Sequence, residues 1–338
     1  MDLKRKVAVL AFWSLLLPTG ANAYFSQNDQ GEEVFSFMST FDSPRNAALE
    51  KAASALPSTD PSIVQLNPGA LRLPEGTKRI AEIHWQTGDM ADNQGSISYT
   101  SSYKWFLYQI SYNWLDYGTL TGYDEYGELT DKEYNPLSQL ATATISFPMK
   151  HIHVGITAKF ASDHLADDEE SDRTAWGAAF DWGITWQSPS KIFGLAVVAR
   201  DFGYLLHDYS DDGVDTFYPM SQTFGISAYY RPVIVPRLTI MAESDFPRYA
   251  EPKLNLAGEY ALGQSFSVRA GFTRAWLDLT RDMKQLISAS SRPDESQYGR
   301  MLSAGLGYNS RLFSLDYSFS YLAQGLGVEH RIGLRVGL

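Results

Sequence analysis

The sequence contains no cysteine among its 338 residues, which excludes a disulfide framework and a thiolate metal site. Beyond its first residues, it also lacks the unbroken apolar run of roughly 20 residues that a membrane-spanning helix requires. Charged residues are sparse at 20%, and the formal net charge is −11. A chain this acidic binds nucleic acid poorly, so we expect no nucleic-acid partner. Any membrane crossing must then be made by strands.

Sequence signatures of catalysis and of metal binding are missing as well. The chain has no GxSxG, HExxH or P-loop motif. His151 and His153 share one face of a predicted strand, but a two-residue spacing without further ligands is a weak metal pattern. The acidic stretch "SDHLADDEESDR" at 162–173 offers oxygen ligands that suit calcium, yet its spacing matches no known loop frame, and a solvated external loop is favoured. We therefore expect no enzyme, no cofactor and no bound metal.

The first 23 residues have the pattern of a secretory signal peptide. Lys4, Arg5 and Lys6 precede an apolar run, and the Ala-Asn-Ala at 21–23 is typical of a cleavage site. We expect three regions: a signal peptide over 1–23, a compact N-terminal segment over 24–77 and a larger domain over 78–338. In the second region, Ser43 can cap a helix that we expect to continue through 47–56. The Asn-Pro-Gly-Ala at 67–70 predicts a turn.

From residue 79 onward, apolar residues recur at every second position, which predicts strands. In "TAWGAAFDWGITWQ" at 174–187, three tryptophans share one face, and small or polar residues fill most of the other. On a strand tilted by about 40°, the span from Trp176 to Trp186 rises about 25 Å, the height of the apolar band on a membrane barrel. We expect Trp176 and Trp186 at the two water interfaces and Trp182 facing lipid. Fourteen such segments lie near 79–87, 93–102, 106–117, 138–148, 152–161, 174–187, 191–202, 220–231, 236–245, 253–261, 266–275, 299–309, 312–321 and 328–338.

The connections between these segments alternate between short and long. Tight links lie near residues 104, 150, 189, 264 and 310, and the long ones span 118–137, 162–173, 203–219 and 276–298. Short turns on one side and long loops on the other are typical of outer-membrane barrels. A secreted β-sandwich also alternates, but its solvated face usually carries more Lys and Glu than these strands do. The sequence therefore predicts an all-β fold: a transmembrane antiparallel barrel of about 14 strands in the bacterial outer membrane, surrounded by lipid, with residues 24–77 as a short helical plug.

The predicted lumen face carries charges of both signs, which must be paired or hydrated inside a barrel. One interpretation is a network that holds the plug and stiffens the wall. The other is a constriction that selects ions. The charged residues are Lys159, Asp181, Arg200, Glu243, Asp245, Glu259, Arg269, Asp316, Arg331 and Arg335.

Several stretches resemble the PorV/PorQ family. "FSFMSTFDSPRNAALEKAASAL" at 35–56 and "DPSIVQLNPGAL" at 60–71 resemble its N-terminal signature. The matching residues there are Ser43, Arg45, Ala48, Leu49, Asp60, Asn67 and Pro68. The stretch "LDYGTLTGYDEYGELTD" at 115–131 resembles the PorQ-like version through Asp116, Tyr117, Gly118, Asp124, Gly127 and Glu128. Glu50 and Lys51 depart from the family, which has two glycines there, and this departure favours a helix over a tight turn.

The resemblance implies a FadL-like barrel with a plug that contains Ser43, Arg45, Asn67 and Pro68. It also implies a role in type IX secretion, as a scaffold or cargo-receiving protein at the cell surface. The implied partners are secreted cargo, a PorU-like sortase and PorV- or PorZ-like components. The loops 118–137, 203–219 and 276–298 are then candidate docking surfaces. Aromatic residues are favoured at interface hot spots, so the candidate anchors are Tyr123, Tyr126, Tyr134, Tyr204 and Tyr209.

Two other functions stay open at this stage. A FadL-like transporter of hydrophobic small molecules would need an apolar pocket and a gap in the wall, and the small, polar and charged lumen face disfavours a large apolar cavity. A plain porin would need an open lumen, which a plug would block.

Overall fold

The computed structural model describes residues 33–88, 91–123, 126–168, 171–209, 219–288, 301–321 and 327–338. The expected signal peptide at 1–23 and Asp124 of the family motif lie outside these residues. No helix in the described ranges is both long and apolar enough to cross a membrane.

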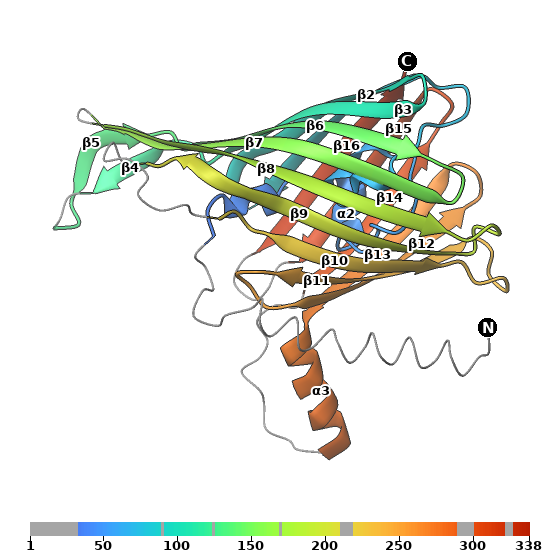
Figure 1. The fold of residues 1–338 in the computed structure, drawn as a ribbon. Helices are drawn as coiled ribbons and strands as arrows, with labels where there is room; N and C mark the ends of the chain where they lie inside the picture. Colours follow the sequence, from blue (N-terminus) through green and yellow to red (C-terminus); the bar gives the residue numbers. More distant parts are fainter. Residues whose placement is uncertain are drawn as a thin grey trace.

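Fourteen antiparallel strands close into a barrel (Figure 1), as the sequence predicted. Around the barrel, β1 lies between β2 and β16, and each following neighbour is the next barrel strand in the chain. The first seven barrel strands are β1 (Arg79–Gly88), β2 (Ala91–Tyr103), β3 (Phe106–Asp116), β6 (Leu137–Pro148), β7 (Ile152–Asp168), β8 (Ser171–Gln187) and β9 (Phe193–His207). The last seven are β10 (Thr223–Tyr230), β11 (Leu238–Pro247), β12 (Lys253–Leu262), β13 (Phe266–Ala275), β14 (Met301–Asn309), β15 (Phe313–Tyr321) and β16 (Val328–Gly337).

The barrel closes where β1 pairs with β16 in continuous register, from Ile80 opposite Gly337 to Gly88 opposite Glu329. Closure removes the free edges that an open sheet would expose to lipid. The period-two pattern of the sequence decides which face each side chain takes. In β8, Trp176 and Trp186 are exposed on the outer wall, whereas Asp181 is buried on the lumen side.

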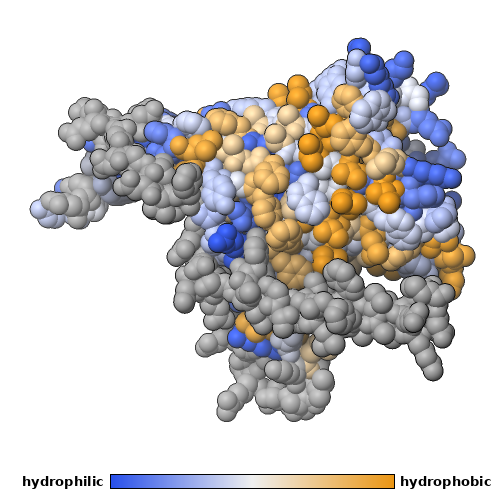
Figure 2. All heavy atoms as spheres, viewed as in Figure 1, coloured by the Kyte–Doolittle hydropathy of each residue, from blue (hydrophilic) through white to orange (hydrophobic). Residues whose placement is uncertain are grey.

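Large apolar side chains are exposed on the outer wall of many strands. Figure 2 shows them gathered on the face in view, between more polar ends. Aromatic rings gather toward the strand ends. At the short-turn end Trp105 stacks on Phe147, with 5.2 Å between ring centroids. At the other end Trp176 stacks on His207, with 6.0 Å between centroids. An apolar band between aromatic girdles is the outer surface that a lipid bilayer requires of a barrel.

Residues 33–77 occupy the interior of the barrel (Figure 1). This segment consists of a short helix, α2 (Pro44–Ala48), and three 3-10 helices at Ser36–Ser39, Pro61–Gln65 and Pro68–Ala70. Two apolar clusters hold it together. One is centred on Leu49, Ile63 and Leu71, and the other includes Phe37 and Phe41. We call residues 33–77 the plug.

The expected helix over 47–56 is wrong in its extent, because α2 ends at Ala48. Glu50 and Lys51 then adopt left-handed backbone conformations, with φ of 45° and 61°. The chain therefore makes the tight turn for which the family uses two glycines, without glycine. Side-chain bonds fix this turn: Thr273 donates to Glu50 Oε2 over 3.0 Å, and Lys51 Nζ lies 3.0 Å from Asp42 Oδ2.

The long connections contain more regular structure than the sequence predicted. The connection at 118–137 forms a separate hairpin of β4 (Leu120–Tyr123) and β5 (Leu129–Tyr134). The acidic stretch at 162–173 is not an irregular loop, because β7 and β8 continue to Asp168 and from Ser171. The connection after β13 begins with the helix α3 (Trp276–Ser288). Backbone pairing and helix formation tolerate charged side chains when these face solvent, so polarity alone does not mark a loop.

Candidate functional site: the plugged lumen

At β7 and β8 the backbone of the plug approaches the barrel wall at two glycines. A Cβ atom at Gly155 would lie 2.3 Å from the carbonyl carbon of Pro68, and one at Gly183 would lie 2.0 Å from Asn67 Oδ1. Both distances are far below van der Waals contact. The glycines on the lumen side of β7 and β8 thus admit the backbone of the Asn67–Pro68 turn, and any larger residue would displace it.

Asn67 bonds to two other parts of the plug and to the barrel wall. Its Oδ1 accepts from the backbone N–H of Gly69 over 2.8 Å, which closes the predicted turn. Its Nδ2 donates to Ser54 O over 2.7 Å and to Thr185 Oγ1 of β8 over 2.8 Å. Asn67 is fully buried and uses both ends of its amide, so it fixes the position of the turn.

Ser43 and Arg45 hold the start of α2. Ser43 Oγ accepts from the backbone N–H of Asn46 over 3.1 Å, as an N-cap does. Arg45 donates through Nε to Glu259 Oε2 over 3.1 Å. Glu259 also accepts from Arg269 Nε over 2.9 Å, and Arg269 bonds in turn to Asp316. This chain of charges links α2 to β12, β13 and β15.

Asp60 of the plug faces Arg335 of the last strand, with 3.2 Å between Oδ2 and Nη1. Burial alone would raise the pKa of the Asp60 carboxyl, but the positive charges of Arg335 and Arg45 outweigh burial and hold that pKa well below its usual value. Asp60 also caps the 3-10 helix Pro61–Gln65 by accepting from the N–H of Ser62 over 3.1 Å. The ionised carboxylate of Asp60 thus binds the plug to β16, the strand that closes the barrel against β1.

A second charge cluster lies on β7, β8 and β9. Lys159 Nζ is 2.8 Å from Asp181 Oδ2 and 2.7 Å from Asp201 Oδ1. The sequence reading missed Asp201, because strict alternation gives consecutive residues opposite faces. The strand register shifts here, so that Arg200 and Asp201 together stand opposite Asp181. Asp201 takes a positive φ of 60°, and this bulge buries both residues, with their charged ends bonded to lumen-side partners.

Arg200 connects this bulge to β11, two strands away, and to the plug. Its Nη1 lies 3.0 Å from Glu243 Oε1 and donates to Leu66 O of the plug over 3.3 Å, while its Nη2 bonds to Asp245. Glu243 also accepts from the backbone N–H of Ser54 over 3.2 Å. All charged residues of the predicted lumen set in this region are therefore paired, as burial requires.

Arg331 lies apart from the plug's ion pairs. It donates to Gln86 Oε1 over 2.6 Å and to Ser320 Oγ over 3.1 Å, and it pairs with Glu329 of its own strand. It therefore braces β1, β15 and β16 to one another. Among the predicted lumen residues, Arg331 bonds to other strands of the wall. Four others bond directly to the plug: Arg200, Glu243, Glu259 and Arg335.

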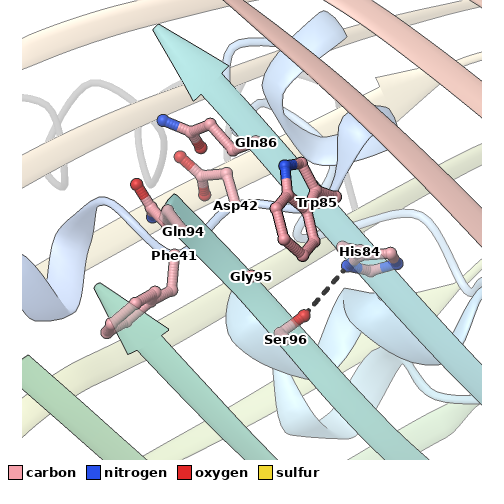
Figure 3. Close-up of a pocket in the computed structure, with 8 residues that line it drawn as sticks. All are labelled: Phe41, Asp42, His84, Trp85, Gln86, Gln94, Gly95 and Ser96. Atoms are coloured by element: carbon pink, nitrogen blue, oxygen red, sulfur yellow. Dashed lines mark hydrogen bonds between the residues drawn. The ribbon is translucent and has the colours of Figure 1, made fainter. Parts of the chain in front are cut away.

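A small cavity remains between the plug and β1–β2 (Figure 3). Its volume is about 10 Å³, which is room for about one water molecule. His84 and Ser96 lie on its wall side, with 3.2 Å between Nδ1 and Oγ. The full lining is Phe41, Asp42, His84, Trp85, Gln86, Gln94, Gly95 and Ser96. Its size suits a water molecule and not a larger ligand. Within the described ranges, no group of three or more His, Asp or Glu side chains could hold a metal ion.

The five candidate docking tyrosines do not form one surface. Tyr123 and Tyr126 are strongly exposed on the β4–β5 hairpin, and Tyr134 is half-exposed at the end of β5. Tyr204 does not lie in a loop, because β9 extends to His207 and places it on the outer wall. Tyr209 is half-buried and donates its hydroxyl to Asp163 Oδ2 over 2.6 Å. Most of the expected loop at 203–219, its residues 210–218, lies outside the described residues, as do residues 289–298 of the expected loop at 276–298.

No protein-family model matches the sequence, and no curated protein matches it either. The PorV/PorQ resemblance therefore depends on the motifs quoted above. Solved structures do match in fold. The toluene transporter TbuX of Ralstonia pickettii has a TM-score of 0.58 at 12% identity, covering 88% of this chain and 98% of that one.

Two further structures agree. The toluene transporter TodX of Pseudomonas putida has a TM-score of 0.57 at 11% identity, covering 86% of this chain and 96% of that one. A FadL homologue of Pseudomonas aeruginosa has a TM-score of 0.51 at 12% identity, covering 87% and 96%. At these identities the likeness establishes the fold, which is a FadL-like barrel. A closed barrel of this fold with an apolar outer band lies in the bacterial outer membrane, as the sequence predicted.

Proposed function

We propose that this chain is a closed outer-membrane barrel that works through its outer surfaces, as a scaffold for other proteins, and not through its lumen. One observation carries the proposal: the plug is bonded to the wall on several sides. Asn67 bonds to β8, Arg45 to β12, Glu50 to β13 and Asp60 to β16. A segment held by so many buried polar contacts cannot leave the lumen without exposing unpaired charges.

The space that is left supports the same proposal. Pockets that bind small molecules usually enclose about 300–1,000 Å³ and are mostly apolar. The cavity beside His84 encloses about 10 Å³. This cavity is too small for such a ligand, which favours a function outside the lumen.

The type IX role is the finer part of this proposal, and its support is the PorV/PorQ-like motifs. In that role the barrel would receive secreted cargo or hold a PorU-like sortase with PorV- or PorZ-like components. The β4–β5 hairpin is the proposed docking element. Tyr126 is 82% exposed there, and an exposed aromatic side chain suits the anchor of a protein interface.

The test is co-purification from detergent-solubilised outer membrane of the native host. A variant with Tyr123→Ser and Tyr126→Ser should lose partners that the unaltered chain retains. The matched control is Ile234→Ser, which removes a side chain that is 94% exposed in the short turn between β10 and β11 at the opposite end. If both variants retain the same partners, the hairpin is not the docking surface. If a deletion strain keeps its secreted cargo on the surface, the secretion role fails.

A FadL-like transporter of hydrophobic molecules is the second candidate, and the fold comparisons favour it over the type IX role. Two of the structural neighbours are toluene transporters with the same barrel over almost their whole length. In this chain, transport would require the plug to move away from the wall. Uptake of radiolabelled toluene and of a long-chain fatty acid into proteoliposomes decides between the candidates. Saturable uptake that depends on the protein supports transport, and uptake equal to that of empty liposomes supports the scaffold.

A further inference from the structure

The helix α3 is fixed to the outer wall by a buried arginine. Arg274 is the last but one residue of β13, on the same face as the outward-facing Phe272, and its side chain is 0% exposed. It donates through Nε and Nη2 to the two carboxylate oxygens of Asp282, over 3.1 Å each. Its Nη1 lies 3.2 Å from Asp278 Oδ2. A bidentate bond plus a second carboxylate ties the acidic face of α3 to the end of β13.

The same attachment turns an apolar stripe of α3 away from the acidic face. Trp276, Leu279 and Met283 follow each other at spacings of three and four residues, which places them along one side of the helix. Trp276 is 39% exposed and Met283 is 55% exposed. Arg281 lies about 160° around the helix from Met283, given 100° per residue, and its side chain is exposed. The helix is thus amphipathic, and its apolar side lacks a protein cover in the described part of the chain.

The position of α3 indicates what covers this apolar side. The helix starts at the long-connection end of β13, which is the outer side of such a barrel. Figure 1 shows that it projects away from the barrel wall and does not lie over the mouth. The wall beside its start is lipid-facing, with Phe272 and Leu256 on the outer surface of β13 and β12. The apolar stripe therefore starts beside the apolar outer surface of the barrel and extends sideways from the outer end of β13.

We propose that α3 is an interfacial helix whose Trp276–Leu279–Met283 stripe inserts into the outer leaflet of the membrane beside the barrel. An amphipathic helix with a charged face and moderate overall hydrophobicity lies in the plane of the interface. The indole of Trp276 suits this level, because tryptophan is enriched where acyl chains meet water. Its Nε1 donates to Ser244 Oγ over 2.7 Å, so the ring is held at the wall. The proposal is independent of whether the barrel acts as a scaffold or as a transporter.

The absence of native cysteine makes a direct test possible. A nitroxide spin label is attached to full-length Met283→Cys, Leu279→Cys and Arg281→Cys in phosphatidylcholine proteoliposomes. Collision rates with oxygen, which concentrates in lipid, and with a water-soluble nickel chelate are then measured. The ratio of oxygen to nickel collisions should be severalfold higher at 279 and 283 than at 281. Retention of the compact, heat-modifiable band on SDS gels shows that each variant is folded.

Two outcomes would overturn the proposal. Equal ratios at 283 and 281 would mean that the stripe is hydrated. Labels at 279 and 283 that collide with neither reagent would mean that protein covers the stripe, and dipolar broadening of their spectra would identify that protein as a second copy. Leu279→Cys repeats the test at a second position of the stripe, so the result does not depend on one variant.

Discussion

Arg335 Nη1 lies 3.2 Å from Asp60 Oδ2, so the last strand of the barrel is bonded to the plug inside it. The same strand, β16, pairs with β1 and closes the barrel. Closure of the wall and seating of the plug are therefore coupled through one ion pair. Because both side chains are largely buried, the pair matters most through what is left behind when one partner is removed.

Asp60→Asn should destabilise the folded barrel by about 1–3 kcal/mol. The cost is smaller than for a fully unpaired buried charge, because Arg335 keeps a weaker pair with Asp316 over 4.0 Å. The asparagine still caps the helix at Pro61–Gln65, so the change isolates the charge. Urea unfolding in liposomes measures the free energy. Adding Arg335→Gln to Asp60→Asn should recover part of the loss, because the cation that lost its nearer carboxylate is then gone. If the double variant is as unstable as the sum of both single variants, the pair is not coupled.

Gly155→Ala should destabilise the protein or displace the plug, because its Cβ would lie 2.3 Å from the carbonyl carbon of Pro68. We expect a loss of at least about 1–3 kcal/mol, as for overpacking in a core. Gly258→Ala is the matched control, since a Cβ there meets no atom within 4 Å. Limited proteolysis of the plug and urea unfolding provide the measurements. Equal behaviour of the two alanine variants would show that the plug does not approach β7 closely.

Lys51→Gly should leave the protein about 1 kcal/mol more stable than Lys51→Ala. Both variants lose the contact with Asp42, but only glycine adopts a φ of 61° without steric cost. Both variants lose the ion pair equally, so the difference between their stabilities reports the cost of the left-handed backbone conformation at residue 51. Thermal mobility shifts on SDS gels would rank them. An alanine variant as stable as the glycine variant would argue against a left-handed conformation at this turn.

Stability of the plug should depend on the ionisation of Glu50. Burial raises the pKa of the Glu50 carboxyl above its ordinary value of 4.5, although Ser303 and Thr273 donate hydrogen bonds that lower it. Because the pKa is raised in the folded state, protonation of Glu50 favours the folded protein over the unfolded chain. This contribution to stability is complete below about pH 4.5 and is lost as the pH rises through the raised pKa.

Glu50→Gln cannot ionise, so it should gain stability relative to the unaltered protein between pH 4 and pH 8. Each unit of pKa shift corresponds to about 1.4 kcal/mol. Urea unfolding at pH 4, 6 and 8 gives the difference between the two chains at each pH. A constant difference across this range would show that burial does not shift the pKa of Glu50.

The sequence predicted the barrel well, because membrane strands must alternate and closure forces every strand to pair. The expected strand at 266–275 agrees with β13 to the residue, and the others agree to within a few residues, apart from extensions at the outer end. Those extensions and the β4–β5 hairpin depend on backbone pairing outside the membrane. In that region no lipid restricts the side chains, so no period-two pattern marks a strand.

The lumen was predicted only in part. Alternation identified Lys159, Asp181 and Arg200, because all three are charges on a face that cannot meet lipid. It could not identify Asp201, since a bulge breaks the alternation there. The partners inside the plug, such as Asp60 for Arg335, are far apart in sequence and are joined by tertiary packing that no local pattern records. Two non-glycine residues in left-handed conformations at 50 and 51 also contradict local preference and exist because side-chain bonds fix them.

The central claim is that the plug closes the lumen, and conductance across planar lipid bilayers tests it most directly. The full-length protein should show no stable ion-conducting steps. A variant lacking residues 35–73 should conduct, provided that its heat-modifiable mobility shows a folded barrel, because its lumen is lined by polar and charged side chains. Steady conductance of the full-length protein, equal to that of the plug deletion, would contradict the account.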